Sequence, residues 1–149
     1  MEPTAPALPP AIQQVLTRFQ SMARDEKMQA LVSYAKRLEP VPERLAMLDR
    51  ASHIVPECQT RVDLFSEMHE GRLHFWADVN ARQSPTVAAF LSITLSAVND
   101  QPPSTTLSIP ADFVSTMMSG LGLSAREVGL NALVSRLKRE ARAALASGV

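Results

Sequence analysis

A single cysteine, Cys58, is the residue of this 149-residue chain best suited to covalent chemistry. It lies two positions after Pro56, whose ring removes a backbone donor and pushes Val55 toward an extended conformation. Neither a helix nor a regular strand is therefore expected to run unbroken into the cysteine. The sequence predicts that Cys58 lies at a loop tip or at the entrance to a strand.

Sulfur transfer between proteins is one chemistry that needs only a single accessible thiol. A thiolate attacks the outer sulfur of a persulfide, and the displaced thiol leaves. Because the chain holds no second cysteine, a persulfide on Cys58 cannot resolve as an internal disulfide. The sulfur would stay on Cys58 until an outside acceptor takes it, which is the behaviour of a carrier.

The alternative is a structural cysteine, because free cysteine is among the most buried residue types and often packs as a small hydrophobe. Under this alternative the protein is a non-catalytic helical adaptor. The polar residues on both sides of Cys58 favour an exposed loop instead; they are Glu57, Gln59, Thr60 and Arg61. The Glu57 carboxylate, however, disfavours a charged thiolate beside it.

Two other kinds of site could use Cys58 together with histidine. A cysteine-protease-like pair needs His53, His69 or His74 within hydrogen-bond reach of the thiol. A structural zinc site needs four ligands, and Cys58 with His69 and His74 supplies only three. No metal site is predicted, and surface or loop packing is the ordinary role of such histidines.

Several segments around and beyond the cysteine match one known pattern. Residues 53–62 read His-x-Val-Pro-x-Cys-Gln-Thr-x-Val, which resembles the motif of the SufE/CsdE-like sulfur acceptors that work with cysteine desulfurases in iron–sulfur cluster assembly. Further matches follow in the family's order: Phe75-Trp76-Ala77-Asp78, Pro85-Thr86-Val87, Leu121-Gly122-Leu123 and the Arg-x-x-Gly-Leu-x-Ala-Leu run at 126–133. Asn80 stands where the family carries a second aspartate. The resemblance extends from about Ile12 to the C-terminus.

The resemblance implies that Cys58 takes persulfide sulfur from a pyridoxal-phosphate cysteine desulfurase (SufS/CsdA-like), stimulates that enzyme and passes the sulfur to an iron–sulfur scaffold complex. It places Arg126 at the start of the last helix, on the surface offered to the desulfurase. Pro56, Gln59 and Asp78 are the other partner-binding residues that it implies. The protein needs no cofactor of its own on this reading, because pyridoxal phosphate belongs to the partner. It would be a sulfurtransferase-type carrier and desulfurase activator rather than a stand-alone enzyme.

Composition and charge narrow the class of protein. The 15 basic and 15 acidic residues cancel, so no global positive field attracts nucleic acid. No apolar run approaches the roughly 20 residues of a membrane-spanning helix, and the acidic, proline-rich N-terminus lacks the features of a secretory signal. We expect a cytoplasmic protein without nucleic-acid or membrane partners, and either a monomer or a weak homodimer.

The N-terminal third is predicted to be helical after a disordered arm at residues 1–10, where four prolines oppose regular structure. Apolar residues at a 3.6-residue period predict a first helix over 11–22. Asp25 is the expected cap of a second helix. Its apolar side is expected to carry Met28, Leu31, Val32, Ala35 and Leu38. A short helical piece is expected from Pro42.

The segment after the cysteine is predicted to form a β-hairpin. Apolar and polar residues alternate over 60–68 and again over 73–77, with a turn at 69–71 between them. Two strands alone are marginally stable. The resemblance implies a three-stranded antiparallel sheet, with the added strand near the cysteine loop.

Three further helices are expected in the C-terminal half. Ser84 and Pro85 are a good cap and first residue for one that ends before the prolines of 99–104. A second begins at Pro110, and a capping box of Ser124 and Glu127 opens the last. The basic residues assigned to the solvent side of that last helix are Arg136, Lys138, Arg139 and Arg142.

The chain length suits one hydrophobic core. The predicted architecture is a single α+β domain at residues 11–149, with a small antiparallel sheet of about three strands packed against several helices. The resemblance implies that this arrangement is SufE/IscU-like.

Overall fold

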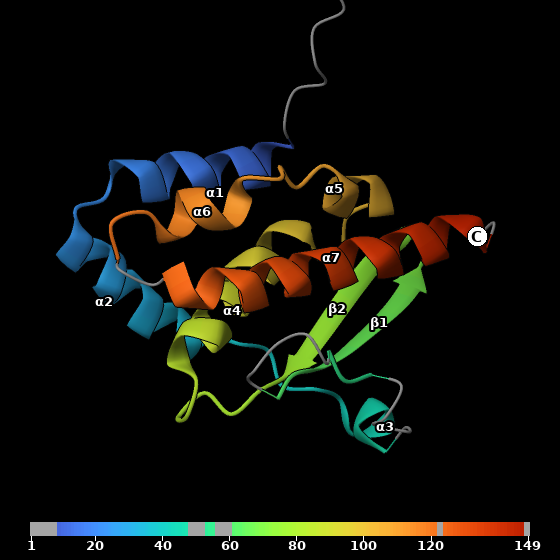
Figure 1. Cartoon of the computed structure of the whole chain (residues 1–149). Helices are drawn as coiled ribbons and strands as arrows, with labels where there is room; N and C mark the ends of the chain where they lie inside the picture. Colours follow the sequence, from blue (N-terminus) through green and yellow to red (C-terminus); the bar gives the residue numbers. More distant parts are fainter. Residues whose placement is uncertain (1–8, 48–52, 56–60, 122–123, 148–149) are drawn as a thin grey trace, which may run out of the picture.

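The computed structural model describes residues 9–47, 53–55, 61–121 and 124–147, except for the side chains of Ser124 and Ala125. Within these ranges the elements follow in the order α1 (Pro10–Ser21), α2 (Arg24–Ala35), α3 (Glu43–Ala46), β1 (Asp63–His69), β2 (Arg72–Asp78), α4 (Pro85–Val98), α5 (Pro103–Leu107), α6 (Phe113–Met118) and α7 (Ser124–Ala146) (Figure 1). The predicted α+β class is confirmed. Most of the predicted N-terminal arm lies outside the described residues.

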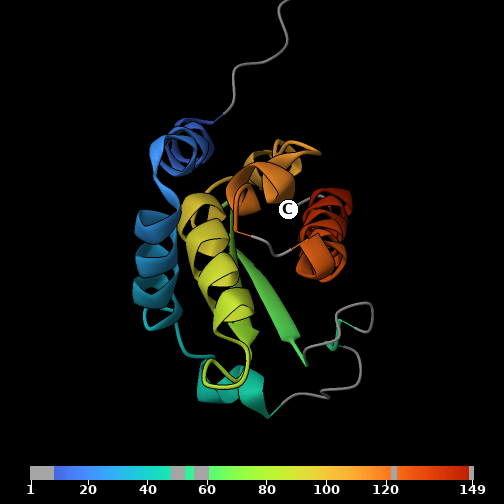
Figure 2. The same cartoon turned by 60° about the vertical axis from the view of Figure 1, so that its left-hand side comes forward.

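Helix α4 forms the centre of the core. It contains no charged residue, and 11 of its 14 residues are buried. An uncharged helix that is buried on nearly all sides needs neighbours on nearly all sides. Figure 2 shows α1 and α2 on one side of α4, α6 and α7 on the other, and the sheet beside it. The helix begins at Pro85, as predicted, because a proline at the first helical position loses no hydrogen bond.

The predicted hairpin is confirmed. Strands β1 and β2 are antiparallel, and His69 pairs with Arg72 across a two-residue turn. Both turn residues have positive φ, 51° at Glu70 and 80° at Gly71. This left-handed pair is the turn geometry that matches the natural twist of a hairpin.

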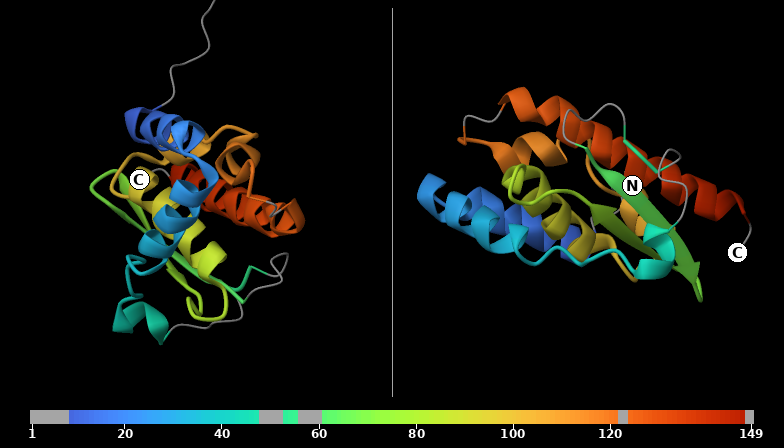
Figure 3. Two further views of the ribbon diagram at one scale, coloured as in Figure 1. Left: turned by 90° about the vertical axis from the view of Figure 1, so that its left-hand side faces the viewer. Right: turned by 90° about the horizontal axis from the view of Figure 1, so that it is seen from below.

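The two faces of the hairpin are buried against different parts of the chain. Leu64 and Phe75 lie in the main core. Phe65 and Trp76, on the opposite face, form a second small cluster with Leu45 of α3. Figure 3 shows α3 in front of the hairpin when the molecule is seen from below. The strands are therefore covered on both faces.

The predicted strand count is wrong for the described residues. Their sheet has two strands, and the segment before the cysteine adds only an isolated antiparallel bridge between Ile54 and Asp63. Pro56 follows almost directly and has no N–H with which to extend a ladder. A second isolated bridge joins Leu73 to Gln101.

Helix α2 corrects two other predictions. It begins at Arg24, and the Glu26 carboxylate, not Asp25, accepts the N–H of Ala23 at its start, at 3.2 Å. Of the expected apolar side, Leu31 and Ala35 are buried, but Met28 and Val32 are exposed. Lys27 lies four residues before Leu31 and is the third buried residue of this helix face. Its Nζ donates to the Ser119 carbonyl at 2.9 Å, and its alkyl chain is buried.

The region between α4 and α7 also differs from prediction. The prolines expected only to stop α4 also start α5, because Pro103 is its first residue. Helix α6 begins at Phe113, three residues later than expected. In the part of the chain that the structure describes, no helix is both long and apolar enough to cross a membrane.

Candidate functional site

The candidate site is the base of the segment that carries Cys58. Cys58 itself lies outside the described residues, as do Pro56 and Gln59. The residues on either side are described, and we call residues 53–55 and 62–64 the stem. The covalent chain limits the Cα of Cys58 to at most about 11 Å from that of Val55.

Backbone hydrogen bonds join the two halves of the stem. The N–H of Val55 donates to the Val62 carbonyl at 2.9 Å, and the N–H of Leu64 donates to the His53 carbonyl at 2.8 Å. The side chains of Val55 and Val62 are buried. The second half of the stem continues into β1, so the first half is held against the start of that strand.

His53 is fixed in the stem by its ring. Its Nδ1 lies 3.1 Å from the Leu64 carbonyl oxygen, and the ring stacks on Phe65 with centroids 4.5 Å apart. A carbonyl can only accept, so Nδ1 carries a proton and Nε2 is the nitrogen left to act as a base in the neutral ring. A cysteine–histidine pair would have to use that atom.

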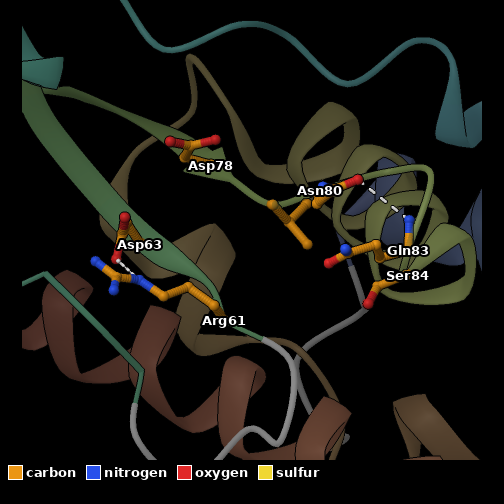
Figure 4. Close-up of a pocket in the computed structure, with 7 residues that line it drawn as sticks. Arg61, Asp63, Asp78, Asn80, Gln83 and Ser84 are labelled. Atoms are coloured by element: carbon orange, nitrogen blue, oxygen red, sulfur yellow. Dashed lines mark hydrogen bonds and ion pairs between the residues drawn. The ribbon is translucent and has the colours of Figure 1, made fainter.

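A cavity of about 400 Å³ opens beside the stem, between the start of β1, the end of β2 and the turn into α4 (Figure 4). It is lined by Arg61, Asp63, Asp78, Val79, Asn80, Gln83 and Ser84. Six of these seven side chains are polar. The cavity is therefore suited to hydrogen-bonding groups rather than to an apolar ligand.

Two carboxylates face each other across the strands in this cavity. Asp63 and Asp78 are direct partners in the β1–β2 register, an arrangement that is unfavourable for like charges. Arg61 Nε forms an ion pair with Asp63 Oδ1 at 3.3 Å, and the Asp63 side chain is only 5% exposed. Asp78, which the sequence singled out for partner binding, is exposed at the end of β2. Its carboxylate is in reach of another molecule.

Asn80 stabilises the turn that follows. Its Oδ1 accepts the backbone N–H groups of Arg82 and Gln83, both at 3.1 Å. The side-chain oxygen at the position of the family's second aspartate is thus used within the chain, as in other Asn-initiated turns.

Arg126 lies in the first turn of α7 and is exposed. The last helix begins at Ser124, one residue earlier than the expected capping box implies, because that box makes Ser124 the cap before the helix. The Ser124 side chain lies outside the described residues. A cation near a helix N-terminus gains nothing from the helix dipole. The position leaves Arg126 available to a partner.

Arg136 is the site residue that sequence reasoning assigns wrongly. The pattern of basic residues puts it on the solvent side of α7, yet its side chain is only 10% exposed and its Nη1 donates to the Ile54 carbonyl at 3.2 Å. The available signal was its spacing: Leu133, Arg136, Leu137 and Glu140 recur on one side of the helix.

The other histidines lie away from the stem. His69 ends β1, six residues and therefore about 20 Å along the strand from Asp63. His74 binds two carboxylates, Asp100 through Nδ1 and Glu39 through Nε2, both at 2.9 Å. Among the described residues, no group of three or more His, Cys, Asp or Glu side chains could hold a metal ion.

Comparisons with known proteins converge on one family. The family model described as "SufE: Fe-S metabolism associated domain" matches residues 13–141. Two uncharacterised SufE-like proteins, from two strains of Mycobacterium tuberculosis, are 34% identical to this chain over 146 residues, covering 95% of this chain and 99% of theirs.

A solved structure is also similar along nearly its whole length. The solution structure of a hypothetical protein from Thermus thermophilus matches with a TM-score of 0.76 and 26% identity, covering 94% of this chain and 99% of the other. The similarity therefore extends far beyond the cysteine motif.

Proposed function

The chain belongs to the SufE family of domains associated with iron–sulfur metabolism, and from that premise we propose that it is a sulfur acceptor that takes persulfide sulfur from a cysteine desulfurase onto Cys58. By clearing the persulfide it stimulates the desulfurase, and it then passes the sulfur to an iron–sulfur scaffold complex. Pyridoxal phosphate belongs to the desulfurase. The chain contributes the accepting thiol and the surface that presents it.

The transfer step exchanges one sulfur–sulfur bond for another. The Cys58 thiolate attacks the outer sulfur of the desulfurase persulfide and forms a new S–S bond. The old S–S bond breaks, and the desulfurase cysteine leaves as a thiolate with the bonding electron pair. No outside oxidant or reductant is needed, because the sulfane sulfur keeps its oxidation state.

The proposal is supported mainly by the hydrogen bonding of the stem. Two hydrogen bonds between residues 53–55 and 62–64 hold together the residues on either side of the Cys58 segment, at the start of β1. Reactive residues are commonly presented by loops on a rigid scaffold, and this arrangement supports such a role for Cys58. A structural cysteine would pack among apolar side chains, whereas the cavity beside the stem is lined mainly by polar ones.

The partner surface is proposed to combine Asp78 and Arg126 with the motif residues Pro56 and Gln59. Both described members are exposed charged side chains, one at the end of β2 and one at the start of α7. A carboxylate and a guanidinium of opposite charge can orient a docking protein as well as attract it.

The test is desulfurase-dependent labelling. Incubation with a cysteine desulfurase and cysteine should add the mass of one sulfur atom to the chain, and alkylation followed by peptide mapping should locate it on Cys58. Cys58→Ser provides a clean control, because it removes the one thiol of the chain and nearly preserves side-chain size. An unmodified Cys58 in the wild type would favour the non-catalytic adaptor.

A further inference from the structure

Arg136 is a nearly buried cation in the middle of α7. Its side chain is 10% exposed, and it follows Leu133 and precedes Leu137, both of which are fully buried. Burying a guanidinium is costly unless its N–H groups are paired. Its partners therefore indicate what the residue does.

The guanidinium joins α7 to the stem. Nε donates to Glu140 Oε1 at 3.1 Å, one helical turn further on, and Nη1 donates to the Ile54 carbonyl at 3.2 Å. The other oxygen of Glu140 accepts the Ser66 hydroxyl of β1 at 3.4 Å. Figure 3 shows α7 running alongside the hairpin. Arg136 and Glu140 thus contact both the first half of the stem and the strand that continues its second half.

The Ile54 carbonyl is the group that the sheet leaves open. In an antiparallel pair, the polar groups of successive residues point alternately toward and away from the partner strand. His53 and Val55 use their carbonyl and N–H toward β1, so the carbonyl of Ile54 points to the free edge. An open edge group needs another donor, which Arg136 supplies.

We propose that Arg136 is a positioning residue that clamps the stem between β1 and α7 and so fixes where the Cys58 segment leaves the sheet. The inference rests on the proposed function for the role of Cys58, whereas the clamp itself can be tested without sulfur chemistry. Ile54 precedes Cys58 by four residues, so a shift at the clamp passes to the thiol through a short covalent path.

Hydrogen exchange tests the clamp. Arg136→Met keeps an apolar side chain of similar length but removes the guanidinium donors. The Val55 and Leu64 amides, which form the stem, are expected to exchange roughly tenfold faster than in the wild type. The Leu73 amide, which donates to Gln101 in the other isolated bridge, should change little. Arg139→Met, an exposed arginine of the same helix, is the matched control and should leave all three amides unchanged.

If Arg136→Met does not fold, Arg136→Lys is tested instead. The Val55 and Leu64 amides should again exchange faster than in the wild type, by a smaller factor. A lysine retains the charge but lacks the planar fork that reaches Ile54 and Glu140 together. Wild-type exchange at both stem amides would overturn the clamp. So would an equal acceleration at Leu73, because that would mark a general loss of stability.

Sulfur uptake tests the positioning. At saturating desulfurase, Arg136→Met should take up sulfur about tenfold more slowly, while the desulfurase concentration for half-maximal uptake stays unchanged. Unchanged uptake with a loosened stem would overturn the positioning role and leave the proposed function standing. If wild-type Cys58 takes up no sulfur, the proposed function fails and the positioning role falls with it, whatever the exchange result.

Discussion

His74 shows how one side chain can hold three segments together. Its Nδ1 binds Asp100, which follows α4, and its Nε2 binds Glu39, which lies between α2 and α3. Glu39 also accepts the indole N–H of Trp76 at 2.8 Å. Partial burial lowers the pKa of His74, but the hydrogen bonds to Asp100 and Glu39 outweigh it, and the net pKa is raised above its usual value.

The raised pKa predicts the direction of a pH effect on stability. A group whose folded-state pKa exceeds its unfolded value contributes stability below the unfolded pKa, about 6.5 for histidine, and loses it as the pH rises through the folded pKa. The free energy of unfolding should therefore fall more for His74→Gln at pH 6 than at pH 9. Urea unfolding at both pH values measures this difference.

His69→Gln is the control for that experiment, because His69 is an exposed histidine of the same hairpin. Its effect on stability should be small at both pH values. A loss in His74→Gln that is as large at pH 9 as at pH 6 would show that the neutral ring, rather than its charge, holds the contacts.

Arg126 is not expected to stabilise the fold. It is exposed in the first turn of α7, where a cation opposes the helix dipole. Arg126→Ala should leave the melting temperature equal or slightly higher. Its affinity for the desulfurase should fall by about 2 kcal/mol if the guanidinium pairs with a partner carboxylate.

Titration calorimetry against the desulfurase, with a melting curve, decides between these roles for Arg126. Arg142→Ala, an exposed arginine near the other end of α7, is the matched control and should bind normally. Unchanged affinity in Arg126→Ala would mean that Arg126 is an ordinary solvent-exposed arginine that does not contact the desulfurase. A large fall in melting temperature would make it structural instead.

Among the elements, the hairpin turn depends most directly on backbone conformation. Gly71 has a φ of +80°, and an added Cβ would meet no atom within 4 Å, so the cost of a substitution is conformational rather than steric. Gly71→Ala should destabilise the protein by about 1–2 kcal/mol. Gly71→Asn should cost less, because asparagine tolerates the left-handed region. Urea unfolding measures both, and equal losses would argue against the conformational explanation.

The elements that could be predicted from sequence are those whose signals are local. The central helix begins at a proline after Ser84 and contains no charged residue, and the hairpin turn contains a glycine between alternating strands. Prediction failed where a group far away in the sequence determines whether a side chain is buried. Lys27 is buried because it reaches the Ser119 carbonyl, which no periodicity in α2 can reveal.

The candidate site divides in the same way. The motif around Cys58 could be read from residue types and order, and the resemblance that it carries singled out Asp78 and Arg126; that both are exposed comes from the structure. The Arg136 contact to Ile54 joins residues 82 positions apart, and its basic side chain looked like one of several on the helix surface. Only the packed chain shows that this arginine points inward.

At the scale of the whole molecule, α7 connects the proposed partner surface to the stem. Arg126 and Arg136 are ten residues apart on this helix, a rise of about 15 Å. One is exposed, and the other is nearly buried against the stem. If Arg126 contacts the partner and Arg136 clamps the stem, as proposed, the packing of α7 on the rest of the core links the two sites.

That packing is expected to be cooperative, and Phe90 tests it. Phe90 is fully buried in α4, and its ring meets Phe113 of α6 edge to face, with centroids 6.0 Å apart. Phe90→Leu should lower the free energy of unfolding by about 1–3 kcal/mol, through lost burial and the lost ring contact. If the domain unfolds as one unit, the slowest-exchanging amides of α1, the hairpin and α7 should lose the same free energy. Met28→Ala, on the exposed side of α2, should change none of them. A loss of protection confined to α4 and α6 would mean that α7 and the stem are stabilised independently, and that a desulfurase could shift them without loosening the core.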